Sequence, residues 1–342
     1  MKKTLFLALM LVIGATAFAQ QQMATLNHND TITVFYGNYA LRDAHNAAVA
    51  GDIVTLSPGT FEKCDITKPI TLRGAGATID TIAGTYPTLI TGDFKLDISK
   101  DPEHCLTMEG ICISQQVTVN KLYNAKFIRC NMYSMWHSAN SSYPAFVAEN
   151  IEIINCIMRE LNVHNFSNES SFTFVNTILV YSSDFDLPVQ FINSLVILNS
   201  SSSCANASAY NSIITRRGGS EKLSSSSNAY NCIFIKNNSG YNYPIFDNTT
   251  NNTNVTYNNL NEVFETWHSC TSSNFSFDER YILKEEIATS FLGSDGTEVG
   301  IHGGMFPFDT RPSYMVVKKC NVANKSTIDG KLSVDIEVMV EE

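Results

Sequence analysis

Short apolar runs recur along residues 127–235, and each is interrupted by one polar residue followed by one small residue. β-Branched and aromatic residues flank the interruption on both sides, a pattern that predicts two short strands joined by a sharp bend. Successive copies lie 26, 21, 17, 18 and 20 residues apart. A period near 20 built from strand-forming residues predicts a solenoid of stacked coils. The polar residue is Arg129 in the first copy and asparagine in the others: Asn155, Asn176, Asn193, Asn211 and Asn231.

The asparagine at each bend is expected to have a positive φ, because apart from glycine it tolerates the left-handed conformation best. Coils stacked about 4.8 Å apart pair their strands in parallel. The amides then lie in one row, and since each can donate and accept, we expect a ladder of hydrogen bonds between them. The next position holds a small residue that fills a tight interior layer. We expect Cys130, Cys156 and Cys232 in this layer, and Cys112 nearby, to be buried free thiols.

Three further segments are typical of a capped solenoid. Residues 40–50 are rich in helix formers and stop at Gly51, where a C-terminal helix cap belongs. The run from Gly51 to Phe61 (GDIVTLSPGTF) and the glycine-rich run from Asp295 to Gly304 (DGTEVGIHGG) resemble the opening and closing coils of secreted β-helices. Together with the asparagine repeats, these runs make the chain similar to the pectate-lyase-like superfamily of right-handed parallel β-helices.

This resemblance implies an all-β fold, a right-handed parallel β-helix with about 20 residues per coil and a capping helix around residues 40–50. The scaffold hosts lyases, hydrolases, esterases and adhesins, so the resemblance implies fold more than activity. Asp52, within the opening run, is expected to be structural. Residues 78–104 break the period, and we interpret them as an excursion from the stack, with the next coil near residue 106.

Residues 1–19 have the pattern of a secretory signal peptide: two lysines, a short apolar run and an Ala-Phe-Ala sequence before Gln20. We therefore expect export to the periplasm, the cell surface or the medium. Loss of Lys2 and Lys3 changes the formal net charge from −10 to −12, which argues against nucleic-acid binding. No later stretch reaches about 18 apolar residues, so no membrane span is expected.

The mature chain is expected to divide into a β-helix and a terminal cap. The β-helix covers residues 20–311, and a β-strand cap covers residues 312–342. Apolar and polar residues alternate in 314–318 and in 331–340, a pattern that predicts a hairpin.

The chain shows no pattern for a metal or another cofactor. Its nine cysteines occur without a CxxC pair and without clustered histidines, so we expect no metal site. The alternative is a Ca²⁺ site formed by the acidic residues within 78–104, although these residues lack EF-hand spacing. The odd number of cysteines leaves at least one free thiol in an oxidising compartment. The disulfide pairing and the oligomeric state stay open.

Polar and aromatic residues between the repeats are the candidate ligand contacts, because only side chains at equivalent positions of adjacent coils reach one sugar. Trp136 offers a ring for stacking on a sugar face. Asp184 and Asp186 come nearest to a carboxylate pair, and Arg216 shares one register with Lys236 as two exposed cations. The candidate ligand-binding residues are Trp136, His137, His164, Asp184, Asp186, Arg216 and Lys236.

No three ionisable residues fall in one register on neighbouring coils, so no catalytic residue is assigned. The sequence therefore favours an exported, non-catalytic β-helix that binds a polysaccharide, a cell-surface glycan or a surface partner. The alternative is a polysaccharide lyase or glycoside hydrolase, whose site lies on the sheet that precedes the asparagine bends. Such an enzyme needs a set of ionisable side chains that converge from neighbouring coils.

Overall fold

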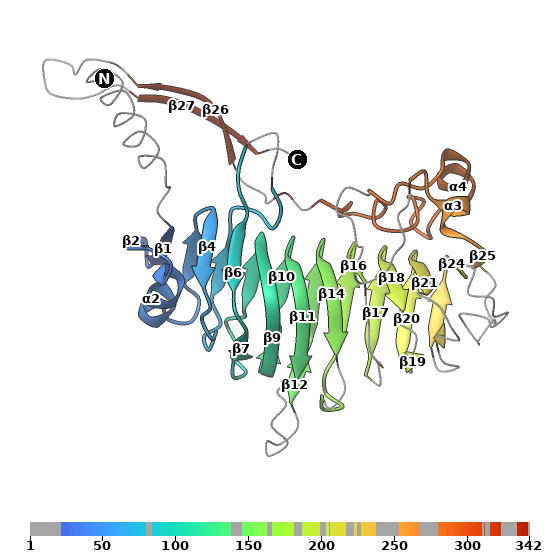
Figure 1. Cartoon of the computed structure of the whole chain (residues 1–342), viewed down its shortest axis with the longest axis horizontal. Helices are drawn as coiled ribbons and strands as arrows, with labels where there is room; N and C mark the ends of the chain where they lie inside the picture. The colour runs from blue at the N-terminus through green and yellow to red at the C-terminus, as the bar shows by residue number, and fades with distance from the viewer. Residues whose placement is uncertain are drawn as a thin grey trace, which may run out of the picture.

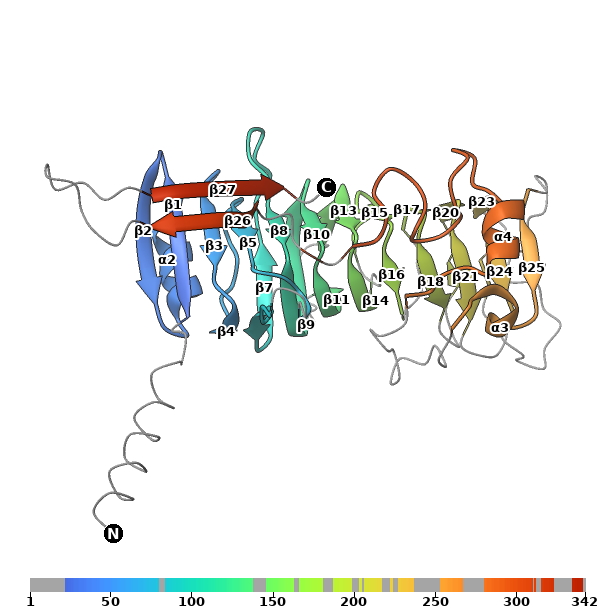
Figure 2. The same ribbon diagram turned by 90° about the horizontal axis from the view of Figure 1, so that it is seen from above.

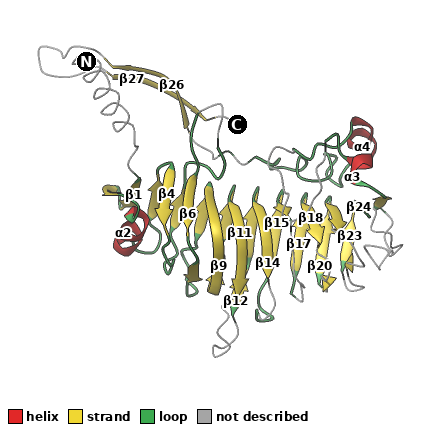
Figure 3. Cartoon of the chain, viewed as in Figure 1, coloured by secondary structure: helices red, strands yellow, loops and turns green. Residues whose placement is uncertain are grey.

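The chain folds as a parallel β-solenoid in the computed structural model (Figure 1). Strands dominate, and the few helices lie towards the two ends of the solenoid (Figure 3). The expected signal peptide lies outside the described residues. The structure describes residues 22–79, 84–137, 146–162, 166–180, 187–198, 203–204, 206–216, 222–223, 227–236, 253–266, 280–309, 311, 315–322 and 334–340.

Sheet A contains the strands that precede the predicted bends. It has 11 strands, which pair in parallel except at the end formed by the first three along the chain. In spatial order these strands are β2 (Thr31–Tyr36), β1 (Met23–His28), β3 (Ile53–Leu56), β5 (Thr71–Arg73), β8 (Thr107–Glu109), β10 (Lys126–Ile128), β13 (Ile151–Ile154), β15 (Phe172–Val175), β17 (Val189–Ile192), β20 (Ala207–Tyr210) and β23 (Asn228–Tyr230).

Sheet B contains the strands that follow the bends, and it has 12 strands. Its main path is β25 (Val255–Tyr257), β24 (Ile233–Ile235), β21 (Ile213–Arg216), β18 (Leu195–Leu198), β16 (Ile178–Leu179), β14 (Ile157–Asn162), β11 (Asn131–His137), β9 (Ile111–Tyr123), β6 (Thr88–Thr91) and β4 (Gly59–Glu62). Two more strands, β7 (Phe94–Asp97) and β12 (Val147–Glu149), also pair with β9. Side chains from the inner faces of both sheets form one continuous core.

The bends have the predicted backbone conformation. Arg129 has a φ of 52°, and the five asparagines have φ values from 45° to 53°. The strand register also follows the predicted repeat, because Ile154 pairs with Val175 and Val175 pairs with Ile192. The left-handed bends and the solenoid period are therefore confirmed for this segment. The asparagines concerned are Asn155, Asn176, Asn193, Asn211 and Asn231.

The predicted ladder of amides between these five asparagines is wrong. Within the described residues no hydrogen bond joins one of these amides to another, and two of their polar atoms, Asn155 Oδ1 and Asn193 Nδ2, are buried without a partner. A contact of the expected kind occurs at the turn that leads from sheet B back to sheet A. There Asn150 Nδ2 donates to Asn124 Oδ1 over 2.9 Å, and both residues have positive φ.

The ladder of hydrogen bonds lies one position further along, in the layer of small residues. The Cys156 amide donates to Thr177 Oγ1 (3.2 Å), the Thr177 amide to Ser194 Oγ (3.2 Å) and the Ser194 amide to Ser212 Oγ (3.1 Å). Thr177 Oγ1 in turn donates to the carbonyl oxygen of Ile153 over 2.9 Å. The bend takes these backbone amides out of the hydrogen-bonded ladder of the sheets. The hydroxyl groups accept hydrogen bonds from them instead, because buried amides require partners.

The N-terminal end is covered by helix α2 (Ala40–Ala47), which confirms the predicted helix. Leu41 and Ala44 are fully buried on its inner side. Asp52 has a structural role, as expected, because its Oδ2 accepts a hydrogen bond from the Val49 amide and its Oδ1 lies 2.8 Å from His28 Nδ1. The antiparallel pair β1–β2, which extends sheet A beyond the first coil, was not predicted.

The interpretation of residues 78–104 as an excursion from the stack is wrong. Strand β6 pairs with β4 and β9 in sheet B, and β7 pairs with β9, so most of this segment belongs to a long coil. Thr71 pairs with Thr107 across that coil. The period is lost because extra residues lie between the end of β5 at Arg73 and the first residue of β6, Thr88.

The segment from residue 280 to residue 309 returns along the solenoid and covers the outer side of the C-terminal part of sheet B, from β14 onward (Figure 2). Ile213 on β21 and Leu195 on β18 pack under Val299 and Ile301 in a second hydrophobic core. For this reason all four residues of β18 are buried. Two short helices, α3 (Leu260–Val263) and α4 (Glu285–Ser290), contribute to the same core.

The returning segment also binds the bend asparagines. Asn176 Nδ2 donates to the carbonyl oxygens of Ile301 (2.9 Å) and Gly303 (2.7 Å). Asn211 Oδ1 accepts a hydrogen bond from the Ser294 amide over 2.9 Å. The bend amides therefore satisfy the buried backbone of a segment that is distant in sequence, which explains why they do not bind one another.

Two further pairs of strands, one antiparallel and one parallel, lie outside the two long sheets. Strand β26 (Met315–Val322) pairs antiparallel with β27 (Val334–Val340), as the alternating pattern predicted. Strand β19 (Ser203–Cys204) pairs in parallel with β22 (Lys222–Leu223). That the hairpin caps the solenoid stays a prediction.

Candidate functional site

The outer face of sheet A carries two parallel rows of side chains along the solenoid axis. Inner and outer residues alternate along each strand, so on β15 Phe172 and Phe174 are buried while Thr173 and Val175 are half-buried. The register of the six strands from β10 to β23 aligns the outer residues. The apolar row consists of Ile128, Ile154, Val175, Ile192, Tyr210 and Tyr230. The polar row consists of Lys126, Glu152, Thr173, Gln190, Ser208 and Asn228.

The apolar row ends in a pair of stacked tyrosines. The ring centroids of Tyr210 and Tyr230 lie 5.3 Å apart with an interplanar angle of 11°. The two rings therefore face each other along the axis of the solenoid. Both residues are half-buried. The row spans five strand spacings of about 4.8 Å, or roughly 24 Å.

Charged side chains from three neighbouring coils meet at the other end of sheet A. Glu109 Oε2 lies 3.7 Å from Arg73 Nε, and Glu109 Oε1 lies 3.8 Å from a terminal guanidinium nitrogen of Arg129. The expectation that no three ionisable residues converge is therefore wrong. It failed because the long coil separates Arg73 from Glu109 in sequence, while pairing of β5 with β8 brings them together. One carboxylate held between two guanidinium groups is an ion-pair cluster rather than an acid–base pair.

Trp136 and His137 lie at the end of β11 and face opposite sides of sheet B: Trp136 faces outward, whereas His137 is on the inner side, in register with the buried Val119. Trp136 is half-buried, and its indole nitrogen has no hydrogen-bond partner among the described residues. The ring of His137 packs against Phe146, with centroids 5.5 Å apart, and against Phe166 at 6.5 Å. His137 is therefore set in an aromatic cluster, whereas the sequence suggested a surface histidine.

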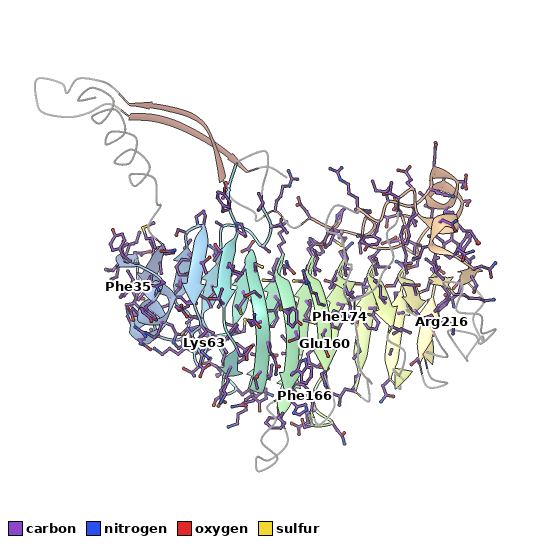
Figure 4. The ribbon with its side chains drawn as sticks, in the orientation of Figure 1. Phe35, Lys63, Glu160, Phe166, Phe174 and Arg216 are labelled. Carbon is purple, nitrogen blue, oxygen red and sulfur yellow. The ribbon has the colours of Figure 1, made fainter. Side chains whose placement is uncertain are left out.

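Glu160 on β14 is a residue that the sequence did not single out. It pairs in register with Ser134, and Trp136 pairs with Asn162, so Glu160 and Trp136 lie on the same outer face. Burial of its carboxyl raises the pKa of Glu160 above its usual value, because burial disfavours the charged form. The pattern of apolar residues does not distinguish Glu160 from the other glutamates of the chain. What distinguishes it in the structure is that neighbouring residues partly bury its carboxyl; Figure 4 shows its place on β14.

Arg216 and Lys236 share one register, but the expected exposure of Arg216 is wrong. The side chain of Arg216 is fully buried, on the inner side of β21 next to Leu198 of the neighbouring strand (Figure 4). Arg216 Nε donates to the carbonyl oxygen of Lys236 over 3.4 Å. The sequence could not show this, because β21 extends beyond its apolar residues Ile213 and Ile214 as far as Arg216, which places Arg216 within the buried strand.

The remaining candidate residues, His164, Asp184 and Asp186, lie outside the described residues. Their roles stay predictions.

The thiols of the interior layer are buried and unpaired. Cys130, Cys156 and Cys232 are free and have no exposed surface, as predicted. Burial raises the pKa of the Cys156 thiol well above its usual value and that of Cys232 to about 12. Cys112 is free but only half-buried. Cys64 and Cys105 are also free thiols.

The acidic residues proposed as a calcium alternative act as local hydrogen-bond acceptors. Asp93 Oδ1 accepts from the Gln116 amide, and Asp101 Oδ1 accepts from the amides of Glu103 and His104. Within the described ranges no group of three or more histidine, cysteine or acidic side chains has a geometry that holds a metal ion. In the same part of the chain, no helix has the length and apolar character to cross a membrane.

Comparisons of the chain with protein-family models, curated proteins and solved structures gave no match.

Proposed function

We propose that the protein is an exported, non-catalytic β-helix that binds a polysaccharide chain along the outer face of sheet A. Export rests on the signal-peptide pattern of residues 1–19. The binding role rests on one observation, the apolar row that ends in the stacked pair Tyr210 and Tyr230 and runs beside a row of hydrogen-bonding side chains.

The two rows match the chemistry of an extended glycan. A sugar ring has an apolar C–H surface and a rim of hydroxyl groups, and proteins bind it with apolar or aromatic side chains beside a few polar groups. Along sheet A each coil offers one apolar and one polar side chain at a constant spacing. Thr173, Gln190 and Ser208 are uncharged, which suits a neutral chain in a protein with a formal net charge of −10.

The test compares binding with and without the tyrosine pair. Wild-type protein, the double variant Tyr210→Ala/Tyr230→Ala and a control variant, Tyr133→Ala, are run by affinity electrophoresis through gels containing cellulose derivatives, xylan, starch or pectin. Tyr133 is 48% exposed on β11 in sheet B, so it controls for loss of an exposed tyrosine elsewhere. We expect retention of wild type and Tyr133→Ala by at least one polysaccharide, and at least about tenfold weaker retention of the double variant.

The proposal fails if none of the polysaccharides retards the wild-type protein, or if the double variant is retarded equally. Binding of the wild type to a protein but to none of the glycans would assign the face to a surface partner instead. Circular dichroism of the double variant separates lost binding from lost folding.

A polysaccharide lyase or glycoside hydrolase is the second candidate, and Glu160 is the observation that favours it. A half-buried carboxyl with a raised pKa is suited to donate a proton to a leaving oxygen, and Trp136 lies on the same face. The same polysaccharides are therefore assayed for reducing ends and for unsaturated products. Release that Glu160→Gln abolishes would establish an enzyme and overturn the non-catalytic proposal.

A further inference from the structure

A pocket of about 500 Å³ lies near the N-terminal end of the solenoid, between α2, the loop after β4, and strands β7 and β9. Lys63 follows β4 and lines this space. The alkyl part of Lys63 lies close to Gly92, which has a φ of 87°: a Cβ on Gly92 would lie 3.1 Å from Lys63 Cδ.

Charged side chains line this wall. Arg42, Lys63 and Lys95 lie there together with Asp65 and Asp93, and Arg42 Nε forms an ion pair with Asp43 Oδ1 over 3.2 Å. Both carboxylates are engaged by backbone amides, since Asp65 Oδ1 accepts from the Lys95 amide (2.8 Å) and Asp93 Oδ1 accepts from the Gln116 amide (3.1 Å).

Among the described residues, neither lysine of this wall is paired with a carboxylate. In the described part of the chain the lysines that form ion pairs with carboxylates are Lys100 and Lys126, so neither Lys63 nor Lys95 does so. Cys64, also on the wall, adds no negative charge, because burial raises the pKa of its thiol to about 11.

We propose that this pocket binds a small acidic sugar, with the anionic group held by the ammonium groups of Lys63 and Lys95. The amide of Asn46 and the hydroxyl of Thr118 line the same pocket and bind the sugar hydroxyls. A volume of about 500 Å³ lies within the range of small-molecule sites. This site is separate from the row of tyrosines and does not depend on the function proposed for sheet A.

Isothermal titration calorimetry of the full chain tests the assignment with glucuronate, glucose 6-sulfate and glucose 6-phosphate as probes, and with glucose and inorganic phosphate as references. The pocket variant is Lys63→Gln/Lys95→Gln. The control is Lys100→Gln/Lys121→Gln, which removes the same charge from two exposed lysines outside the pocket. We expect wild type and control to bind at least one acidic sugar, with affinity that falls as ionic strength rises. The pocket variant should bind about tenfold or more weakly.

Four results would overturn the proposal: no saturable binding of any acidic sugar by wild type, equal binding by the pocket variant, equal binding of glucose, or binding of inorganic phosphate as tight as that of the sugars. The last result would leave only a simple anion site. Lys63→Arg/Lys95→Arg keeps both charges and should retain binding, and circular dichroism of the glutamine variant separates lost binding from lost folding. The tyrosine variant of sheet A should bind these monosaccharides normally.

Discussion

Replacing Asn176 by alanine should release the returning C-terminal segment from the solenoid. The Asn176 side chain is 1% exposed and donates two hydrogen bonds, to Ile301 O and Gly303 O. Each is worth about 1 kcal/mol, so about 2 kcal/mol is lost with both. Alanine must also adopt the φ of 45° at this bend, which costs roughly 1 to 2 kcal/mol. We expect Asn176→Ala to lower the free energy of unfolding by about 3 to 4 kcal/mol.

Asn193 provides the matched comparison for this prediction. It has the same bend geometry, with a φ of 47°, and is 2% exposed, but its Nδ2 has no hydrogen-bond partner. Asn193→Ala therefore tests the left-handed backbone alone and should cost about 1 to 2 kcal/mol. Glycine removes the backbone penalty, so Asn176→Gly should cost about 2 kcal/mol and Asn193→Gly less than about 0.5 kcal/mol.

Urea unfolding followed by circular dichroism measures the four free energies, and hydrogen exchange locates the effect. Amides of residues 300–304 should exchange faster in both Asn176 variants and at the wild-type rate in both Asn193 variants, because local opening follows the loss of local hydrogen bonds. Equal destabilisation by Asn176→Gly and Asn193→Gly, or unchanged exchange in residues 300–304, would refute the role of the bend amide in holding this segment.

Three further predictions concern other parts of the solenoid. Thr177→Val leaves the Cys156 amide without its acceptor and should destabilise the protein by about 1 to 3 kcal/mol in urea unfolding, whereas Thr177→Ser should restore most of the loss. Burial lowers the pKa of His45 from 6.5 to about 4. The free energy of unfolding should therefore be highest above pH 6.5 and fall by up to about 3 kcal/mol as the pH drops towards 4. His45→Gln should flatten this pH dependence, and an unchanged slope in that variant would contradict the prediction. Iodoacetamide at mildly alkaline pH should modify the half-buried Cys105 but leave Cys232 unmodified until denaturant is added; rapid native labelling of Cys232 would count against its burial.

The repeat of apolar residues around single asparagines was sufficient to predict the solenoid, its period and the left-handed bends. Both signals are local, since alternation of side chains and tolerance of positive φ belong to a few consecutive residues. The helix at residues 40–50 and the strands of the terminal hairpin could be predicted for the same reason.

The partners of those residues could not be predicted from the same pattern. The bend amides were expected to bind one another, yet Asn176 and Asn211 bind a segment that follows them by more than 80 residues. The burial of Arg216 and the cluster of Arg73, Glu109 and Arg129 were missed as well. In each case the contact depends on which distant strand or segment lies alongside.

By itself the sequence therefore determined how each coil is built: strand, left-handed bend, small buried residue, strand. The tertiary structure decided what lies on each outer face, because the second hydrophobic core covers the C-terminal strands of sheet B while the rows on sheet A stay half-exposed. Local conformational preference acts within one coil, whereas exposure and charge pairing depend on the register between coils and on the path of the returning chain.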